Sequence, residues 1–98
     1  MPFPRESRFL PKRIRENEIM ILKVISPEKQ YLCCEVTAVE LPGTKGRFMV
    51  LRGHAPLISS LTEGFVRYDR VGGTEREELG IKGGFVEVLD DNITLCVD

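Results

Sequence analysis

The single histidine, His54, lies in the segment Gly53-His54-Ala55-Pro56-Leu57, a few residues before Ser59. A histidine can act as general base for a serine nucleophile when a third group holds its ring in place. The chain has no Gly-x-Ser-x-Gly elbow to present such a nucleophile. A lone histidine before Ala-Pro is more typical of a turn or a contact residue, so a small hydrolase using His54 with Ser59 or an acid is the least favoured hypothesis.

Two glycines flank a threonine and a lysine in Gly43-Thr44-Lys45-Gly46, which raises the question of a phosphate-binding loop. Such a loop needs the spacing Gly-x-x-x-x-Gly-Lys-Ser/Thr at the start of a helix, where backbone N–H groups surround the phosphates. Here Arg47 follows the second glycine, and a strand-like segment follows Arg47. The pattern therefore predicts a β-turn that closes a hairpin.

Cysteines and acids do not form a metal-binding pattern. Three cysteines occur, two of them adjacent as Cys33 and Cys34, and one histidine cannot complete a zinc site with them. We expect buried thiols that act as small hydrophobic side chains in a reducing compartment. Glu77-Glu78 and Asp90-Asp91 are expected on the solvated surface, since neighbouring strand residues point to opposite faces. The prediction is no metal, no cofactor and no catalytic residue.

The composition fits one folded domain. The chain has 98 residues, of which 42% are hydrophobic and 30% charged, and its net charge is −1. This charge is too small for electrostatic binding of nucleic acid, and Phe48, Phe65 and Phe85 each lie in a strand of core character. No run approaches the ~20 apolar residues of a membrane span, so direct insertion into lipid is not expected. The N-terminus lacks the apolar centre of a signal peptide.

Short strand patterns separated by turn residues fill the chain from Met20 onward. Val66 and Tyr68 share one face of their strand, whereas Arg67 and Asp69 take the other. Gly72-Gly73 predicts a tight hairpin, and the segment Asp90-Asp91-Asn92 predicts another turn. The predicted strands cover residues 21–25, 31–41, 47–51, 57–61, 64–71, 74–81, 85–89 and 92–98.

The strand pattern predicts an all-β sandwich or barrel over residues 20–98. Residues 1–19 are polar, contain three prolines and are expected to be an N-terminal extension, poorly ordered or with a short helix. A wrongly assigned upstream start explains this extension better than a docking arm. An exposed patch at residues 56–58 would suit a protein contact. The residues alone thus favour binding or assembly over catalysis, and a stand-alone module for a peptide or small ligand remains the alternative.

The segments LKVISPEK (22–29), LPGTKGRF (41–48), GHAPLISSL (53–61), EGFVRY (63–68) and IKGGFVEV (81–88) together resemble the N-terminal domain of the F-type ATP synthase epsilon subunit. The resemblance covers about residues 20–98. It implies a flattened β-sandwich of short, mostly antiparallel strands and a non-catalytic role in the rotor. In this family the subunit binds the gamma subunit and the polar loops of the c-ring, and so couples ion flow to ATP synthesis.

The resemblance also implies where each partner binds. The segment Ser26-Pro27-Glu28 and the residues His54, Ala55, Pro56, Leu57 and Ser59 are expected to face gamma. The turn formed by Thr44, Lys45, Gly46 and Arg47 is expected near the c-ring loops. We further expect a protein that is monomeric when isolated and peripheral on the cytoplasmic face of the bacterial inner membrane, as part of the complex.

Three features depart from the family pattern. No helical pattern and no Asp-x-x-Arg-Ala motif follow Val97, so either a naturally short form or a truncated chain is expected, in both cases without hairpin-based inhibition or a nucleotide site on this chain. Arg47 stands where relatives often carry a small or acidic residue, and ring loops commonly present arginine. Either the ring offers an acid, or Arg47 points elsewhere. The extension at residues 1–19 lies outside the usual start.

Overall fold

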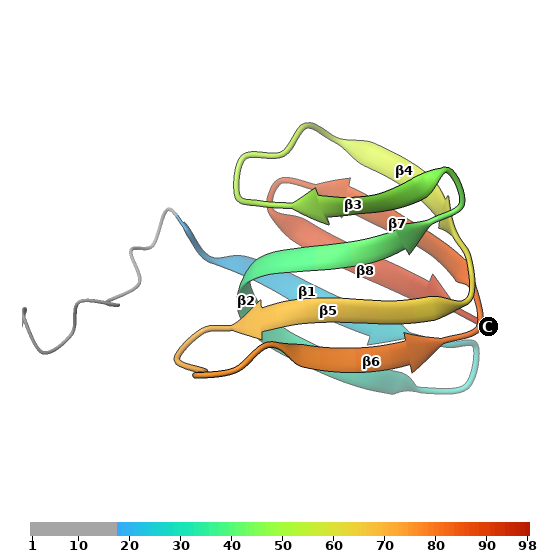
Figure 1. Cartoon of the computed structure of the whole chain (residues 1–98), viewed down its shortest axis with the longest axis horizontal. Coiled ribbons are helices and arrows are strands. Elements are labelled where there is room, and N and C mark those ends of the chain that lie inside the picture. Colours follow the sequence, from blue (N-terminus) through green and yellow to red (C-terminus); the bar gives the residue numbers. More distant parts are fainter. Residues whose placement is uncertain (1–17) are drawn as a thin grey trace, which may run out of the picture.

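The computed structural model describes residues 18–98, which form eight β-strands and no α-helix (Figure 1). This confirms the predicted all-β fold. The expectation for residues 1–17 of the extension lies outside the described residues. The strands are β1 (Met20–Ile25), β2 (Gln30–Gly43), β3 (Gly46–Val50), β4 (Leu57–Leu61), β5 (Gly64–Arg70), β6 (Glu77–Ile81), β7 (Gly84–Leu89) and β8 (Asn92–Val97).

The strands form one continuous sheet that folds into two layers (Figure 1). One layer holds β1, β8, β7 and β4, and the other holds β3, β2, β5 and β6. Every strand pairing is antiparallel except that between β1 and β8, which is parallel. This arrangement is the mostly antiparallel sandwich that the family resemblance implied.

Strand β2 belongs to both layers. Its first half pairs with β1, from Gln30 opposite Ile25 to Val36 opposite Met20, and its second half pairs with β3 and β5. The register with β5 shifts between Val36 and Ala38, which marks a bulge at Thr37. A bulge bends its strand and increases the local twist, so β2 can pass from one layer into the other.

Alternating side chains from both layers fill the space between them. In β1 the residues Leu22 and Val24 are fully buried while Lys23 between them is exposed, as the two-residue period of a strand requires. The core consists of Met20, Leu22, Val24, Val36, Val39, Leu41, Val50, Leu61, Val66, Tyr68, Ile81, Val86, Val88, Ile93, Leu95 and Val97. Tyr68 is the member with a polar group, and its hydroxyl donates to Glu77 Oε1 at 3.1 Å.

Two tight turns form where the sequence predicted them. Gly43 pairs with Gly46, so Thr44 and Lys45 alone close the β2–β3 hairpin. The β7–β8 hairpin is closed by Asp90 and Asp91, with φ angles of 51° and 64°. A two-residue turn with positive φ at both central positions matches the right-handed twist of the flanking strands, and aspartate tolerates that conformation better than most residues.

The predicted tight hairpin at Gly72-Gly73 is wrong in its length. Pairing between β5 and β6 ends at Tyr68 opposite Glu77, and β6 begins at Glu77 rather than at residue 74. Gly73 N–H donates to Arg70 O at 2.9 Å, which forms a local turn, and Arg76 then binds Asp69 across the loop, with Nε 2.9 Å from Oδ1. This ion pair closes a longer loop than the glycines alone predicted.

Two further expectations about burial are wrong. Phe65 and Phe85 are 50% and 51% exposed, because Val66 and Val86 take the inward positions next to them. The three cysteines are free, and none is fully buried: Cys33 is exposed on β2, whereas Cys34 and Cys96 are half-buried. Cys34 packs against the core from the inward face of β2, and burial raises the pKa of its thiol.

Replacing Gly43 by alanine tests the close packing at the β2–β3 turn. A Cβ at this position would lie 2.7 Å from Gly46 O and 2.8 Å from Phe48 Cε1. We expect Gly43→Ala to lower the free energy of unfolding by about 1–3 kcal/mol in urea titrations. Gly80→Ala is the matched control, since a Cβ there would meet the Phe65 ring at an ordinary 3.5 Å. Equal stability of the two variants would contradict this account.

Candidate partner-binding surfaces

The β3–β4 loop carries the predicted contact residue His54. His54 N–H donates to Leu51 O at 3.0 Å, and Gly53 adopts a φ of 86°, which a turn requires at this position and which favours glycine. Asp91, from the β7–β8 turn, accepts a hydrogen bond from Gly53 N–H at 2.9 Å and forms an ion pair with Arg52. These contacts hold a loop whose residues 51–56 are all exposed.

The imidazole of His54 is engaged with the backbone rather than with a nucleophile. Its Nδ1 lies 2.8 Å from Ala55 O, so the ring N–H donates to that carbonyl. Ser59 donates its hydroxyl to Ser60 O at 3.2 Å. Within residues 18–98 no serine or carboxylate hydrogen-bonds the imidazole. The hydrolase hypothesis therefore lacks the geometry that general-base catalysis needs.

A second predicted contact, Ser26-Pro27-Glu28, forms the turn between β1 and β2. Ser26 N–H donates to Lys29 O at 2.8 Å, and Ser26 Oγ accepts from the backbone N–H groups of Glu28 and Lys29, each at 3.3 Å. Ser26 thus fixes the turn, while Pro27 and Glu28 are exposed. Pro27, Glu28 and the neighbouring Lys29 are therefore the residues of the turn that are most open to a partner.

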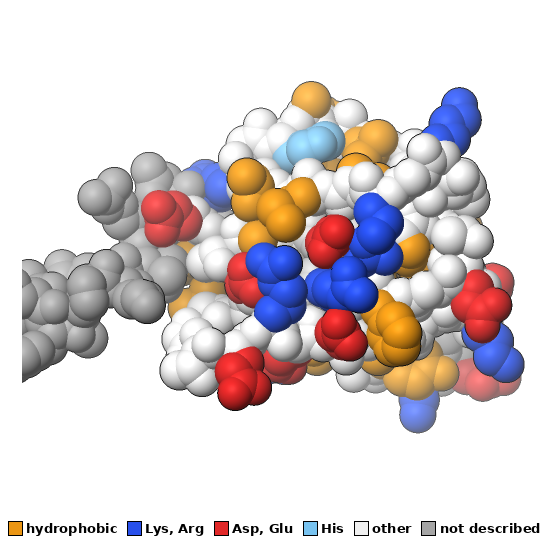
Figure 2. Space-filling model, viewed as in Figure 1, with side chains coloured by type: hydrophobic (Ala, Val, Ile, Leu, Met, Phe, Trp, Pro, Cys, Tyr) orange, Lys and Arg blue, Asp and Glu red, His pale blue; other side chains and the backbone are white. Residues whose placement is uncertain are grey.

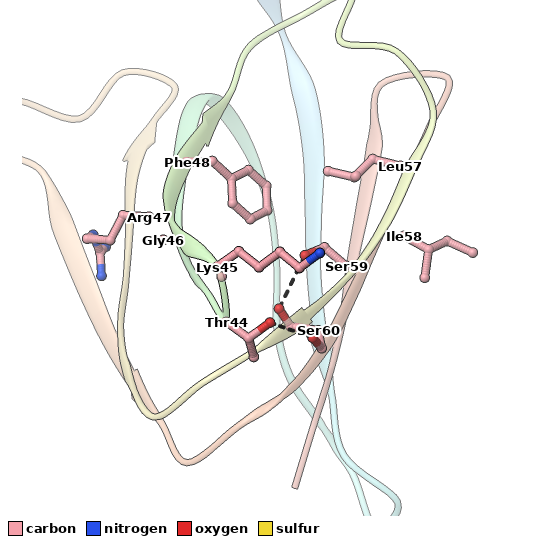
Figure 3. Close-up of a pocket in the computed structure, with 10 residues that line it drawn as sticks. Thr44, Lys45, Gly46, Arg47, Phe48, Leu57, Ile58, Ser59 and Ser60 are labelled. Atoms are coloured by element: carbon pink, nitrogen blue, oxygen red, sulfur yellow. Dashed lines mark hydrogen bonds between the residues drawn. The ribbon is translucent and has the colours of Figure 1, made fainter.

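The turn predicted to meet the c-ring lines an open hollow of about 510 Å³ between β3 and β4 (Figure 3). Thr44 Oγ1 lies 2.8 Å from Ser60 Oγ, and Thr44 N–H donates to Ser60 O at 3.2 Å, so β4 braces the turn. Lys45 extends across the hollow, whereas Arg47 points away from it (Figure 3). Arg47 Nε binds Glu40 Oε2 at 3.0 Å, and its Nη2 donates to Phe65 O at 2.8 Å.

The two predicted gamma-facing segments lie at opposite ends of the sandwich. The β1–β2 turn follows Ile25, which pairs with Cys96. Cys96 lies close to Gly84 and Leu61, at the end of the sandwich where Leu61 pairs with Gly43. The β3–β4 loop instead precedes Leu57, next to Val88 and the Asp90-Asp91 turn. The intervening strands of five or six residues span roughly 17–20 Å. A single partner touching both segments must cover the length of this layer.

The outward face of β4 and β7 lies between these segments and carries exposed apolar side chains. Ile58, Phe85 and Leu89 are 73%, 51% and 47% exposed. Residues 57, 86 and 88 point inward along the same strands, so alternation alone would have placed Phe85 and Leu89 outward. Sequence reasoning identified Ile58 but missed Phe85 and Leu89. We call Ile58, Phe85 and Leu89 the apolar face.

The outward face of the other layer carries ion pairs at its centre, beside the exposed apolar side chains of Met49 and Phe65. Arg67 bridges Glu40 at 3.7 Å and Glu78 at 2.7 Å, and Glu40 also binds Arg47, which gives a four-residue ladder across β3, β2, β5 and β6. Figure 2 shows these acidic and basic side chains interleaved over the centre of the face. We call this set the charged ladder. Its charges are matched on neighbouring strands, so it presents no net charge to a ligand.

Ion pairs lower the pKa of three carboxylates on this layer, those of Glu40, Asp69 and Glu77. The hydrogen bond from Arg47 lowers the pKa of Glu40, and that from Arg76 lowers the pKa of Asp69. Arg70, 3.0 Å from Glu77, lowers the pKa of Glu77 in the same way. Tyr68, next to Glu77, has a raised pKa, first because of burial and then because of its hydrogen bond to that carboxylate. The three carboxylates are therefore charged at neutral pH.

Other kinds of site find no support in the part of the chain that the structure describes. Residues 18–98 contain no group of three or more His, Cys, Asp or Glu side chains arranged to hold a metal ion. Nor does any helix there have the length and apolar character needed to cross a membrane. The arrangement defines a class: a small β-sandwich with exposed turns at both ends and exposed apolar side chains on the outward face of β4 and β7.

Comparison with known proteins gives the family. The family model described as "ATP synthase, Delta/Epsilon chain, beta-sandwich domain" matches residues 19–98. The chain is 46% identical over 77 residues to the ATP synthase epsilon chain of Magnetococcus marinus and 44% identical over 77 residues to that of Desulfitobacterium hafniense. The chain belongs to the family of ATP synthase delta/epsilon chains, through their β-sandwich domain.

The matched region is a part of each relative. The match covers 79% of this chain but 55% of the Magnetococcus protein and 57% of the Desulfitobacterium protein. The fold also resembles a chain in the Euglena gracilis mitochondrial ATP synthase structure of OSCP, F1 and c-ring, with a TM-score of 0.75, 22% identity, and coverage of 94% of this chain and 62% of that one. A chain in the Tetrahymena thermophila central stalk and c-ring structure gives a TM-score of 0.65 at 15% identity, with coverage of 80% and 62%.

The charged ladder generates a prediction about pH. The pKa of its member Glu40 is lowered in the folded protein by the hydrogen bond from Arg47, so the contribution of Glu40 to stability is present above its ordinary pKa and is lost as the pH falls through the folded pKa. We expect urea midpoints to decrease between pH 6 and pH 3, and Glu40→Gln to reduce that decrease. Glu63→Gln, an exposed acid outside the ladder, is the control. A pH response unchanged by Glu40→Gln would contradict the role of the ladder.

Proposed function

We propose that this protein is a non-catalytic rotor component of an F-type ATP synthase, which binds the gamma subunit and the c-ring in the central stalk and couples ion flow to ATP synthesis. The observation that carries the proposal is the family match across residues 19–98. We propose residues 20–98 as the domain, with 1–19 as an extension. We place the protein on the cytoplasmic face of the membrane as part of the complex, and we expect a monomer when it is isolated.

The proposed gamma contact consists of Pro27, Glu28, His54, Ala55 and Pro56, together with Ser26, Leu57 and Ser59 as predicted from the resemblance. The apolar face supports the proposal because it joins the two ends on which these residues lie. Burial of exposed apolar side chains would add the favourable free energy that a durable contact needs. An interface of this kind requires on the order of 1,000 Å².

The proposed ring contact is the turn Thr44–Arg47. Thr44 and Lys45 form the turn itself, and Ser60 braces it from β4. Arg47 is turned back onto the sheet, where Glu40 neutralises its charge. This geometry favours the alternative in which Arg47 points elsewhere, and it reduces the repulsion expected against arginine on ring loops. We therefore assign the ring contact to Lys45 and the backbone of the turn.

Substitutions on the two layers test the gamma contact. We expect His54→Glu and Ile58→Asp each to weaken binding of purified gamma by about 10-fold or more, since each places a charge in a buried contact. Ile58 is the better probe than Leu57, because Leu57 packs partly against the core and its replacement by aspartate would also destabilise the fold.

Met49→Asp provides the matched control, because Met49 is 41% exposed on the opposite layer. This variant should bind gamma as the unaltered protein does in calorimetric titrations. Equal loss in all three variants would show that the effect is not specific to the apolar face. Unchanged affinity of His54→Glu and Ile58→Asp would remove both residues from the interface, and failure of the unaltered protein to bind gamma would overturn the proposed function.

A further inference from the structure

Asp91 connects three segments that are distant in the sequence. Its Oδ1 accepts a hydrogen bond from Gly53 N–H at 2.9 Å, and its Oδ2 accepts from Arg52 Nε. Its backbone carbonyl accepts from Ile21 N–H at 3.0 Å. The residue therefore ties the β7–β8 turn both to the β3–β4 loop and to the start of β1.

The hydrogen bond and the ion pair with Asp91 help to hold the β3–β4 loop in one conformation. Its residues 51–56 are exposed and lie between strands, and Gly53 adopts a φ of 86°. Glycine loses more conformational freedom on folding than any other residue, so holding this segment in one conformation costs free energy. A carboxylate that accepts the Gly53 N–H and pairs with Arg52 offsets that cost, since hydrogen bonds to a charged acceptor are stronger than those between neutral groups.

We propose that Asp91 is a positioning residue, which holds the β3–β4 loop in the conformation that presents His54, Ala55 and Pro56 to the partner. This inference rests on the proposed gamma contact. A loop that is already ordered loses less entropy on binding, so its partner binds more tightly. Asp91 need not touch gamma for this effect, because it acts through Arg52 and Gly53.

The neighbouring residue Asp90 supplies a matched control. Both aspartates occupy the same two-residue turn with positive φ, 51° at Asp90 and 64° at Asp91. Asp90 is exposed, and its backbone carbonyl accepts from Asn92 Nδ2 at 3.1 Å. Glycine adopts positive φ without steric cost, so replacing either aspartate by glycine keeps the turn. Only the replacement at position 91 removes the carboxylate that contacts the β3–β4 loop.

The experiment compares the full-length protein with Asp91→Gly, Asp90→Gly and Asp91→Asn. For each, affinity for purified gamma is measured by calorimetry, stability by urea unfolding, and exchange of the Gly53 amide proton by NMR. We expect Asp91→Gly to remain folded but to have a lower free energy of unfolding than Asp90→Gly, to bind gamma about 10-fold more weakly and to exchange the Gly53 amide faster. Asp90→Gly should bind as the unaltered protein does.

Asp91→Asn separates positioning from a general effect on the fold. Its amide oxygen can still accept from Gly53 N–H but carries no charge for Arg52, so we expect an affinity between those of the unaltered protein and Asp91→Gly. Equal affinity of Asp91→Gly and Asp90→Gly would overturn the inference while leaving the proposed function in place. Failure of the unaltered protein to bind gamma would overturn both.

Discussion

The fold depends on one strand that serves two layers. Strand β2 pairs with β1 before the bulge at Thr37 and with β3 and β5 after it. The bend of β2 at this bulge sets how the two layers lie relative to each other. It therefore also sets which turns lie at the same end of the sandwich. The β1–β2 turn and the β2–β3 turn fall at one end, and the β3–β4 loop falls at the other with Asp91. A partner therefore meets surfaces whose spacing is set by a hydrogen-bonded sheet rather than by flexible segments.

The two outward faces of the sandwich differ in what they offer a partner. On the layer of β3, β2, β5 and β6, Arg67 lies between Glu40 and Glu78, and Arg47 pairs with Glu40. A partner that covered this face without complementary charges would desolvate these ion pairs, which costs free energy. On the layer of β4 and β7, Ile58, Phe85 and Leu89 are exposed and covering them is favourable, whereas Glu87, which lies opposite Ile58 on the same face, needs a polar partner when it is covered. The chemistry of the faces thus favours a protein contact on the β4–β7 layer.

Much of the fold could be predicted because it is local. Strands follow from the two-residue period, and the turns at residues 43–46 and 90–91 follow from glycine and aspartate at positions that need them. The exposure of Phe65 and Phe85 could also have been predicted, since Val66 and Val86 already occupy the inward positions beside them. The longer β5–β6 loop could not, because the ion pair between Asp69 and Arg76 that closes it depends on the geometry of both strands.

The relative placement of the candidate contacts and the role of Asp91 also lay beyond sequence reasoning. The contact between Asp91 and Gly53 joins residues 38 positions apart, and no local pattern specifies that distance. The conformation of the turn gives a physical argument for the role of Asp91. Aspartate tolerates a φ of 64° better than most residues, but glycine would adopt it at lower conformational cost, so the turn alone does not require an aspartate there. Its carboxylate recovers that cost through Arg52 and Gly53 in another hairpin. Asp90, with the same backbone conformation, has no such contact with the loop in the described structure. The two aspartates therefore share one turn but differ in their contacts, because the carboxylate of Asp91 holds the β3–β4 loop and that of Asp90 does not.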